Sequence, residues 1–472
     1  MAPSRQNERM TVVAIIGAGP GGYEAALVAV QLGAEVTIID PEGPGGSAVL
    51  TDCVPSKTLI ATADVLTQAR DSVSLGVRVD SQTPRGHLNV DLGAVNERVH
   101  RLALAQSHDI ESRLARDGVR YLRGHGRLVS AQEVVVDTGD GEVRLAADVI
   151  LIAAGARPRV LEEGLPDGER ILTWEQLYDL EDLPERLIVV GSGVTGAEFA
   201  SAYGILGSDV VLVSSRDHVL PGEDPDAAQV IEEVFADRGM TVLARSRAVA
   251  ARRTETGVAV ELQDGRVVEG SHVLMAVGSL PNTEDLGLAA AGVEVDERGF
   301  ITVDRVSRTS ARGVYAAGDC TGVLMLASVA AMQGRIAMWH ALGDAVGPLD
   351  RGHVANTVFT TPEIATVGVT QREVDAAEAR ADEVMLPLAT NARAKMQEIR
   401  HGFVKIFCRP SSRIVIGGVV VGPRASELIH AVALAVDARL TVDQLASTFT
   451  VYPSLSGSIA EAARQLRRAG EE

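Results

Sequence analysis

Cysteine is scarce in this sequence of 472 residues, with three residues at positions 53, 320 and 408. So few cysteines exclude a disulfide framework, and neither they nor the ten histidines are paired at the spacing of metal ligands. We therefore predict no metal site and interpret Cys320 and Cys408 as structural residues. The scarcity also favours a reducing, cytoplasmic location.

Basic residues are also fewer than acidic residues. The sequence has 44 lysines and arginines and 63 aspartates and glutamates, so the formal net charge is -19. Such a surplus of negative charge repels phosphate backbones and anionic lipids, so we expect neither nucleic acid nor a membrane surface as a partner. Long hydrophobic runs are missing too. No stretch approaches the ~18 apolar residues of a membrane span, and the early run TVVAII stops at Gly17, which is too short for a signal sequence.

The sequence is instead rich in glycine, and some of its glycines belong to an internal repeat. An apolar run leads directly into a GxGxxG pattern in residues 11–24 and again in residues 185–198. The glycines are Gly17, Gly19 and Gly22 in the first copy and Gly191, Gly193 and Gly196 in the second. The second copy lies 174 residues after the first, and the same offset carries Glu24 onto Glu198 without a gap.

This pattern is typical of the strand, tight turn and helix start of a dinucleotide-binding fold. The first glycine is needed for the turn, the second lets backbone N–H groups approach a pyrophosphate, and the third allows the helix to pack on the strand. A single copy could be a structural turn. Two copies in register, each after a strand-like run, indicate two dinucleotide-binding domains.

The residue at the end of the second strand of each dinucleotide-binding fold distinguishes the two copies. An acidic residue there can hydrogen-bond the ribose hydroxyls of a nucleotide. Asp40 closes this strand in the first copy, whereas the second copy has Ser214, followed by Ser215 and Arg216. The missing carboxylate removes a repulsion, and a guanidinium can pair with a 2′-phosphate, so we expect the second site to accept NADPH, alone or alongside NADH. The alternative is that Arg216 is a solvated loop charge.

The segment around Cys53 reads GGSAVLTDCVPSK and resembles the active-site helix of the flavoprotein disulfide reductases, the family of lipoamide dehydrogenase and glutathione reductase. That family has two cysteines five residues apart, whereas this sequence has Ala48 five residues before Cys53. Thiol–disulfide exchange passes through a mixed disulfide that a second thiolate must resolve, so one cysteine cannot pass electrons to a disulfide in this way. Another electron acceptor is required.

The resemblance extends over nearly the whole chain and implies an α/β fold with two Rossmann-like dinucleotide-binding domains and a C-terminal α+β dimerisation domain. It implies an FAD domain of residues 1–157 and 286–346, an NAD(P) domain of residues 158–285 and an interface domain of residues 347–472. The split of the FAD domain is indicated by VYAAGD, which follows the second glycine pattern and resembles the second flavin motif of the family. There Asp319 would bind the ribityl chain of FAD; the alternative is a turn aspartate at a strand end.

The same resemblance implies the cofactor-binding residues. FAD would be bound by Gly17, Gly19, Pro20, Gly22, Asp40, Gly46, Ser47, Lys57, Gly126, Gly155, Asp319 and Ala327. NADH or NADPH would be bound by Gly191, Gly193, Val194, Thr195, Gly196, Glu198, Ser214, Ser215, Arg216 and Gly278. Ala327 begins a helix whose N-terminus would stabilise negative charge on reduced flavin.

The resemblance also places Lys57 against flavin N5, paired with Glu198, where the pair would polarise N5 and position the nicotinamide for hydride transfer. The alternative for Lys57 is an ordinary lysine on a helix surface. Cys53 would be either a thiol next to the flavin or a small buried hydrophobic residue, and both interpretations stay open.

From Thr357 onward the sequence resembles the interface domain of the family. That domain builds a homodimer and delivers a His-Pro motif, with a glutamate five residues after the histidine, into the partner's active site. Here Tyr452 takes the histidine position and Gly457 the glutamate position. Tyrosine titrates at pH ~10, far from the working pH that general acid–base catalysis favours, and glycine cannot orient a base. Neither residue therefore fits the acid–base role. For Tyr452 both a catalytic role and aromatic packing stay open.

The changes at Ala48 and at Tyr452 with Gly457 remove complementary halves of disulfide reduction, while the residues expected to support hydride transfer remain. We therefore predict a homodimeric FAD-dependent NAD(P)H oxidoreductase that passes hydride to flavin and on to quinone-type small molecules, and not a disulfide reductase. A second enzymatic hypothesis is a pyridine nucleotide transhydrogenase. A third hypothesis is a non-catalytic redox sensor or complex subunit that binds both cofactors.

Overall fold

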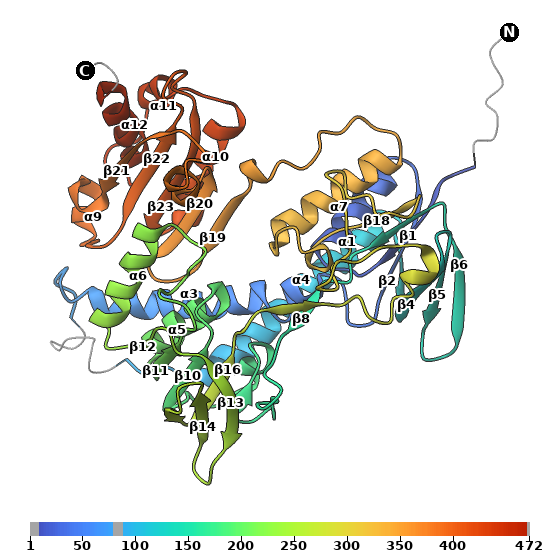
Figure 1. Ribbon diagram of the computed structural model, residues 1–472, viewed down its shortest axis with the longest axis horizontal. Coiled ribbons are helices and arrows are strands. Elements are labelled where there is room, and N and C mark those ends of the chain that lie inside the picture. Colours follow the sequence, from blue (N-terminus) through green and yellow to red (C-terminus); the bar gives the residue numbers. More distant parts are fainter. Residues whose placement is uncertain (1–8, 79–87, 470–472) are drawn as a thin grey trace. The chain divides into compact units, whose positions relative to one another are not determined.

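The computed structural model describes residues 9–78 and 88–469, which divide into two units (Figure 1). The first unit contains the described residues up to 56 together with residues 97–158 and 279–350. The second contains the described residues of 57–96, residues 159–278, and the described residues from 351 onward. The chain therefore crosses between the units several times.

A parallel five-stranded sheet forms the centre of the first unit, in the order β18-β7-β1-β2-β3. Its strands are β1 (Val12–Ile16), β2 (Glu35–Asp40), β3 (Arg120–Arg123), β7 (Val149–Ile152) and β18 (Val314–Ala316). Alternate residues of β1 face opposite sides, as the period of a strand requires. Val13 and Ile15 belong to the core that includes α1 (Pro20–Gln31) and α7 (Ala327–Ala341), which lie side by side in Figure 1. Ala14 and Ile16 belong to the core on the other face.

The strand β18 joins the first sheet from a distant part of the sequence. It lies in the sequence after the second glycine pattern, yet it pairs in parallel with β7, with Val314 opposite Ile150. The first unit also contains two small antiparallel sheets and further helices. These elements are β4 (His125–Ser130), β5 (Glu133–Asp137), β6 (Glu142–Ala146), β8 (Ala156–Pro158), β17 (Ser279–Pro281), α2 (Gly46–Leu50) and most of α4 (Leu92–Arg116).

The second unit begins in α3 (Cys53–Asp71) and contains a second parallel sheet in the order β12-β11-β10-β16-β9. The strands are β9 (Ile171–Leu172), β10 (Arg186–Val190), β11 (Asp209–Val213), β12 (Thr241–Leu243) and β16 (His272–Met275), and the helices are α5 (Val194–Leu206) and α6 (Pro225–Asp237). An antiparallel sheet joins β13 (Ala248–Arg253), β14 (Val258–Leu262) and β15 (Val267–Gly270). The order β11-β10-β16 repeats the order β2-β1-β7 of the first unit, as the internal repeat predicts.

The C-terminal part of the second unit is an antiparallel sheet covered by helices, which is the expected α+β arrangement. The strand order is β19-β20-β23-β22-β21. The strands are β19 (Ala355–Val358), β20 (Glu363–Gly368), β21 (Asp382–Pro387), β22 (Phe403–Cys408) and β23 (Val415–Gly422), and the helices are α8 (Gln371–Asp375), α9 (Ala392–Met396), α10 (Ala425–Asp437), α11 (Val442–Ser447) and α12 (Gly457–Ala469). Residues of β20 to β23 and of α10 to α12 share one hydrophobic core.

Cys320 and Cys408 both lie in the interior of the protein. Cys320 and Cys408 are fully buried in hydrophobic cores, and burial raises the pKa of the Cys320 thiol to about 12. Such thiols are inert, as the structural interpretation requires. Of the helices formed by the described residues, none combines the length and apolar character needed to cross a membrane.

Candidate cofactor and redox site

Both glycine patterns form the same tight turn between a strand and a helix. Gly17 and Gly191 have φ angles of 103° and 112°, and a Cβ atom on either would lie 2.1 Å from a backbone oxygen. A Cβ atom on the third glycine would lie 1.9 Å (Gly22) or 1.8 Å (Gly196) from the carbonyl oxygen of the first. Any other residue would be strained or would overlap with the backbone. The first and third glycines are therefore required by the packing of the protein itself.

The middle glycines differ, because a Cβ atom on Gly19 or Gly193 would meet no other atom within 4 Å. Each is the N-cap of a helix, α1 or α5, and Pro20 follows in the first turn of α1. The first N–H groups of a helix have no partner within the helix and carry partial positive charge. Open space in front of such N–H groups fits a pyrophosphate, so the residues present fit a dinucleotide at each turn.

Asp40 and Ser214 occupy equivalent places after β2 and β11 but have different partners. The Asp40 carboxylate accepts a hydrogen bond from the Ala18 N–H at 2.8 Å and from two N–H groups just downstream at 2.9 Å. The Ser214 hydroxyl instead lies 2.7 Å from the hydroxyl of Ser192, which is the residue equivalent to Ala18. A neutral hydroxyl pair therefore replaces the carboxylate beside the second glycine turn.

Arg216 is exposed directly after this hydroxyl pair, and within the described part of the chain its side chain forms no ion pair. Its carbonyl oxygen accepts a hydrogen bond from the N–H of Arg245 at 2.9 Å. The side chain of Arg245 is itself 82% exposed and lies 3.9 Å from Asp217. Sequence reasoning missed Arg245, because nothing in its local pattern links it to the second glycine turn.

The other expected FAD residues of the first unit lie near its glycine turn. A Cβ atom on Gly46, the first residue of α2, would lie 2.8 Å from the Cα atom of Gly19, so α2 packs directly on the turn and brings Ser47 with it. Gly126 on β4 faces the end of β1 at Ile16. Gly155 follows β7 with a φ angle of 68° and open space around it.

The remaining expected nicotinamide residues lie at the equivalent edge of the second sheet. Val194 and Thr195 form the first turn of α5, and Ser215 lies beside Ser214 in the loop after β11. Gly278 follows β16 with a φ angle of 102° and open space around its Cα atom. These residues occupy the carboxyl ends of parallel strands, where α/β sheets bind nucleotides.

Asp319 lies in the first unit after β18, in a short 3-10 helix (Asp319–Thr321), and α7 begins at Ala327 a few residues later. Burial, followed by the charge of Asp52, raises the pKa of Asp319 to about 6. A hydroxyl donating to this carboxylate would offset the cost of burial. The residue therefore fits a role in binding the ribityl chain.

The raised pKa of Asp319 predicts a pH-dependent stability of the apoprotein. An unfolded aspartate has a pKa of ~3.9, so between that value and about 6 the folded protein holds a proton that the unfolded chain has released. The free energy of unfolding should therefore fall as pH rises through this window, by on the order of 2–3 kcal/mol. Thermal unfolding of wild-type and Asp319→Asn apoprotein should show the variant gaining relative stability as pH rises. A difference that does not change with pH would contradict this.

Lys57 and Glu198 form an ion pair in the second unit. Lys57 Nζ lies 2.9 Å from Glu198 Oε2, and the side chains are 31% and 4% exposed. The other carboxylate oxygen of Glu198 accepts a hydrogen bond from the Phe359 N–H at 2.8 Å. The Phe359 ring centroid lies 5.0 Å from Lys57 Nζ, within cation–π range. The pair is therefore oriented by a residue of the C-terminal sheet that sequence reasoning did not identify.

Ala48 and Cys53 lie on two consecutive short stretches of helix, α2 and the start of α3. Cys53 is half-buried, whereas the other two cysteines are fully buried in hydrophobic cores. For Cys53 both interpretations, a thiol next to the flavin and a small hydrophobic residue, therefore stay open.

Tyr452 lies in an exposed stretch before α12. The exposed fractions of Phe449, Val451 and Tyr452 are 103%, 77% and 85%, which is unusual for three large apolar side chains in one stretch. Gly457 is the first residue of α12, and a Cβ atom there would make only ordinary contacts, the nearest at 3.6 Å. Glycine at this position is therefore not required by the fold.

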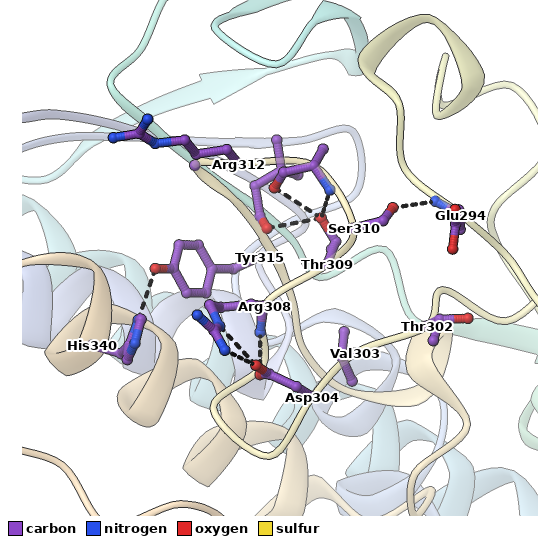
Figure 2. Close-up of a pocket in the computed structure, with 13 residues that line it drawn as sticks. Glu294, Thr302, Val303, Asp304, Arg308, Thr309, Ser310, Arg312, Tyr315 and His340 are labelled. Atoms are coloured by element: carbon purple, nitrogen blue, oxygen red, sulfur yellow. Dashed lines mark hydrogen bonds and ion pairs between the residues drawn. The ribbon is translucent and has the colours of Figure 1, made fainter.

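A cavity of about 620 Å³ in the first unit is separate from these residues (Figure 2). Its lining includes Arg308, paired with Asp304 at 2.6 Å, and Tyr315, whose hydroxyl lies 2.9 Å from Nδ1 of His340. None of the expected cofactor residues lines it. The cavity lies at the amino end of β18, whereas cofactors bind at the carboxyl ends of parallel strands. The glycine turns, and not this cavity, are the candidate cofactor sites.

Comparison with known proteins identifies the class. The family model for pyridine nucleotide-disulphide oxidoreductases matches residues 11–334, and the model for the dimerisation domain of these enzymes matches residues 354–463. The chain belongs to this family of oxidoreductases, which use FAD and NAD(P)H, and it carries the dimerisation domain.

Individual relatives cover the whole fold. The chain is 56% identical over 467 residues to an NAD(P)H dehydrogenase (quinone) of Mycobacterium tuberculosis, which covers 97% of this chain and 94% of that protein. It is 33% identical over 449 residues to a dihydrolipoyl dehydrogenase of Chlamydia pneumoniae, with 95% of each chain covered. The crystal structure of LpdA from Mycobacterium tuberculosis superimposes with a TM-score of 0.92 at 55% identity, covering 97% of this chain and 100% of that one.

Proposed function

We propose that this NAD(P)H oxidoreductase transfers electrons through FAD to quinone-type small molecules and does not reduce disulfides. One combination of residues carries the proposal: the chain keeps the Lys57–Glu198 pair, yet has Ala48 and Tyr452 where disulfide reduction would need a second thiol and a base. The relative named NAD(P)H dehydrogenase (quinone), at 56% identity, supports the same acceptor class.

Each group of residues has a separate task in this proposal. The first glycine turn, Asp40 and Asp319 hold FAD, which supplies the chemistry of accepting a hydride and releasing electrons singly or in pairs. The second glycine turn holds the nicotinamide nucleotide. The ammonium of Lys57, held in place by Glu198, acts at flavin N5 and orients the site for hydride transfer. Quinones accept electrons without a thiol intermediate, so this step does not need a second cysteine.

The active form in this proposal is a homodimer. The dimerisation domain supports this assembly, as do the exposed side chains from Phe449 to Tyr452, because large apolar groups clustered in one stretch are typical of surfaces that another chain covers. Tyr452 would then lie at the site of the second subunit, where an aromatic ring suits packing against a planar acceptor better than it suits proton transfer.

Steady-state turnover of the holoenzyme with NADPH and three acceptors tests the function. We expect activity with menadione and with ferricyanide, and activity with lipoamide at least about 100-fold lower because both the second thiol and the base are missing. Turnover with lipoamide equal to that with menadione would refute the proposal. Faster transfer to thio-NAD⁺ than to any quinone would identify a transhydrogenase instead, and no turnover with any acceptor would identify a sensor.

Arg216 gives a further prediction on nucleotide preference. Because Ser214 is neutral and Arg216 is exposed next to it, replacing Arg216 by alanine should raise KM for NADPH about 5- to 10-fold and leave KM for NADH nearly unchanged. The double variant with Arg245→Ala should extend the loss, because the backbone hydrogen bond between the two residues places a second exposed guanidinium beside the same loop. Unchanged discrimination in both variants would show that these guanidinium groups are only solvated loop charges.

A further inference from the structure

Lys405 on β22 is a buried ammonium group in the C-terminal sheet. Its Nζ atom lies 2.8 and 3.1 Å from the carboxylate oxygens of Asp224, 2.5 Å from an oxygen of Asp226 and 3.1 Å from the amide oxygen of Gln371. The side chains of Lys405 and Asp224 are each 2% exposed. Burial alone would lower the pKa of Lys405, but the hydrogen bonds to the two aspartates outweigh burial and raise the pKa, so the group is charged.

The two aspartates lie at the start of α6, in the part of the chain that follows the second glycine turn. Asp224 is the N-cap of α6, and its carboxylate accepts hydrogen bonds from the N–H groups of Asp226 and Ala227 at 3.0 and 3.2 Å. One carboxylate therefore caps the helix and binds Lys405 at the same time. The position of this helix start is tied directly to β22.

Two more side chains of the C-terminal sheet region hold the same segment. Arg372 on α8 donates a hydrogen bond to the carbonyl oxygen of Pro221 at 2.6 Å, and Asn356 on β19 donates to Glu223 at 3.5 Å. We call Asn356, Arg372 and Lys405 the clamp. Its three residues come from separate elements of one sheet region, and all of them contact the short segment from Pro221 to Asp226.

Leu220, the residue directly before that segment, contacts the second glycine turn. The Leu220 N–H donates to the carbonyl oxygen of Ser192 at 2.8 Å, and Leu220 is buried with a left-handed φ angle of 52°. A leucine rarely adopts this conformation, so its surroundings must hold it there. Ser192 in turn contacts Ser214 through its hydroxyl. The clamp is thus connected, through Leu220, to both parts of the expected nucleotide site.

We propose that the clamp positions the loop from Ser214 to Asp224 for pyridine nucleotide binding, and that Lys405 is the main positioning residue. This inference rests on the proposed use of the second glycine turn for NAD(P)H. None of the three clamp residues is among the expected nucleotide-binding residues. They fix the segment that directly follows Leu220, whose N–H donates to Ser192 in the glycine turn.

The use of lysine supports a specific geometric role. The chain has three lysines, at positions 57, 395 and 405, and every other basic side chain in the count of 44 is an arginine. An ammonium is compact and can donate in three directions, whereas a guanidinium is larger and planar. Three acceptor side chains around one Nζ atom match the ammonium. In a chain that otherwise uses arginine, we therefore expect Lys405→Arg to fail as a replacement.

The test measures nucleotide binding to the FAD-loaded enzyme. Calorimetric titration with NADP⁺ should give a Kd about tenfold higher for Lys405→Met than for wild type, with turnover at saturating NADPH changed less than about twofold and with unchanged FAD content. Arg372→Met removes one exposed contact with little risk to folding, and should raise Kd about threefold. Lys405→Arg should resemble Lys405→Met.

Two control variants separate positioning from general stability. Within the described part of the chain, the Arg413 side chain binds Asp382 at 2.7 Å and the carbonyl oxygen of Leu466, neither of which belongs to the clamp, and Lys395 is an exposed lysine on α9. Arg413→Met should lower the melting temperature but leave Kd for NADP⁺ unchanged, and Lys395→Met should change neither. Unchanged Kd in Lys405→Met and in Arg372→Met, or an equal rise in Arg413→Met, would overturn the inference. Failure of wild type to bind NADP⁺ or NAD⁺ would instead overturn the proposed function.

Discussion

Replacing Lys57 by methionine is expected to slow the reduction of bound FAD by NADPH by at least about 100-fold, because removing one oriented donor from a largely buried site costs ~10²–10³ in rate. The Lys57 ammonium is held on one side by Glu198 at 2.9 Å and on another by the ring of Phe359 at 5.0 Å. No methionine rotamer can supply this charge. Anaerobic stopped-flow absorbance of the flavin after mixing with NADPH measures the rate directly.

Two control variants separate the effect of Lys57 on the reaction from its effect on stability. Lys57→Met leaves the Glu198 carboxylate buried without its cation, which destabilises the protein apart from any effect on chemistry. The double variant with Glu198→Gln should recover thermal stability but not the rate. Lys395→Met makes the same substitution at an exposed position and should reduce normally. Wild-type kinetics of flavin reduction in Lys57→Met would contradict the proposed role of the pair.

The features that could be predicted from the sequence are those fixed by local backbone geometry. The glycines of the two turns are set by contacts within a strand–turn–helix unit, such as the 1.9 Å approach of a Gly22 Cβ atom to the Gly17 oxygen. Any chain that folds this way must show the pattern, so the pattern predicts the fold. The 174-residue offset then identified Ser214 as the neutral equivalent of Asp40, which the structure shows as a serine pair with Ser192.

Contacts between distant segments could not be predicted in this way. Phe359, directly after β19, reaches Glu198 across 161 positions of the chain, and Lys405 reaches Asp224 across 181 positions. Neither residue has a neighbouring motif, and each could equally be an ordinary core or surface residue when only the sequence is considered. Within the second unit, the packing of the C-terminal sheet against the second parallel sheet brings each residue to its partner. No local pattern in the sequence encodes this packing.

Introducing a cysteine at Ala48 is not expected to create a disulfide reductase. The variant would place a second thiol five residues before Cys53, and free-thiol titration should show whether the two sulfurs become oxidised and are reduced again by NADPH. Lipoamide turnover should nevertheless remain below about 1% of that of the triple variant Ala48→Cys, Tyr452→His, Gly457→Glu, because general acid–base catalysis contributes ~10²–10⁴-fold. Steady-state assays with lipoamide compare the two variants.

The triple variant is a fair comparison because the fold accepts its substitutions. A Cβ atom at position 457 would meet its nearest neighbour at an ordinary 3.6 Å, and the side chain at position 452 is 85% exposed. Reduction of a disulfide must protonate a leaving thiolate, which a histidine can do near neutral pH and a tyrosine cannot. Lipoamide activity in Ala48→Cys alone, equal to that of the triple variant, would show that the missing thiol by itself sets the acceptor. Activity that appears only with all three changes would show that thiol and base were two halves of one reaction, and that this chain lacks both.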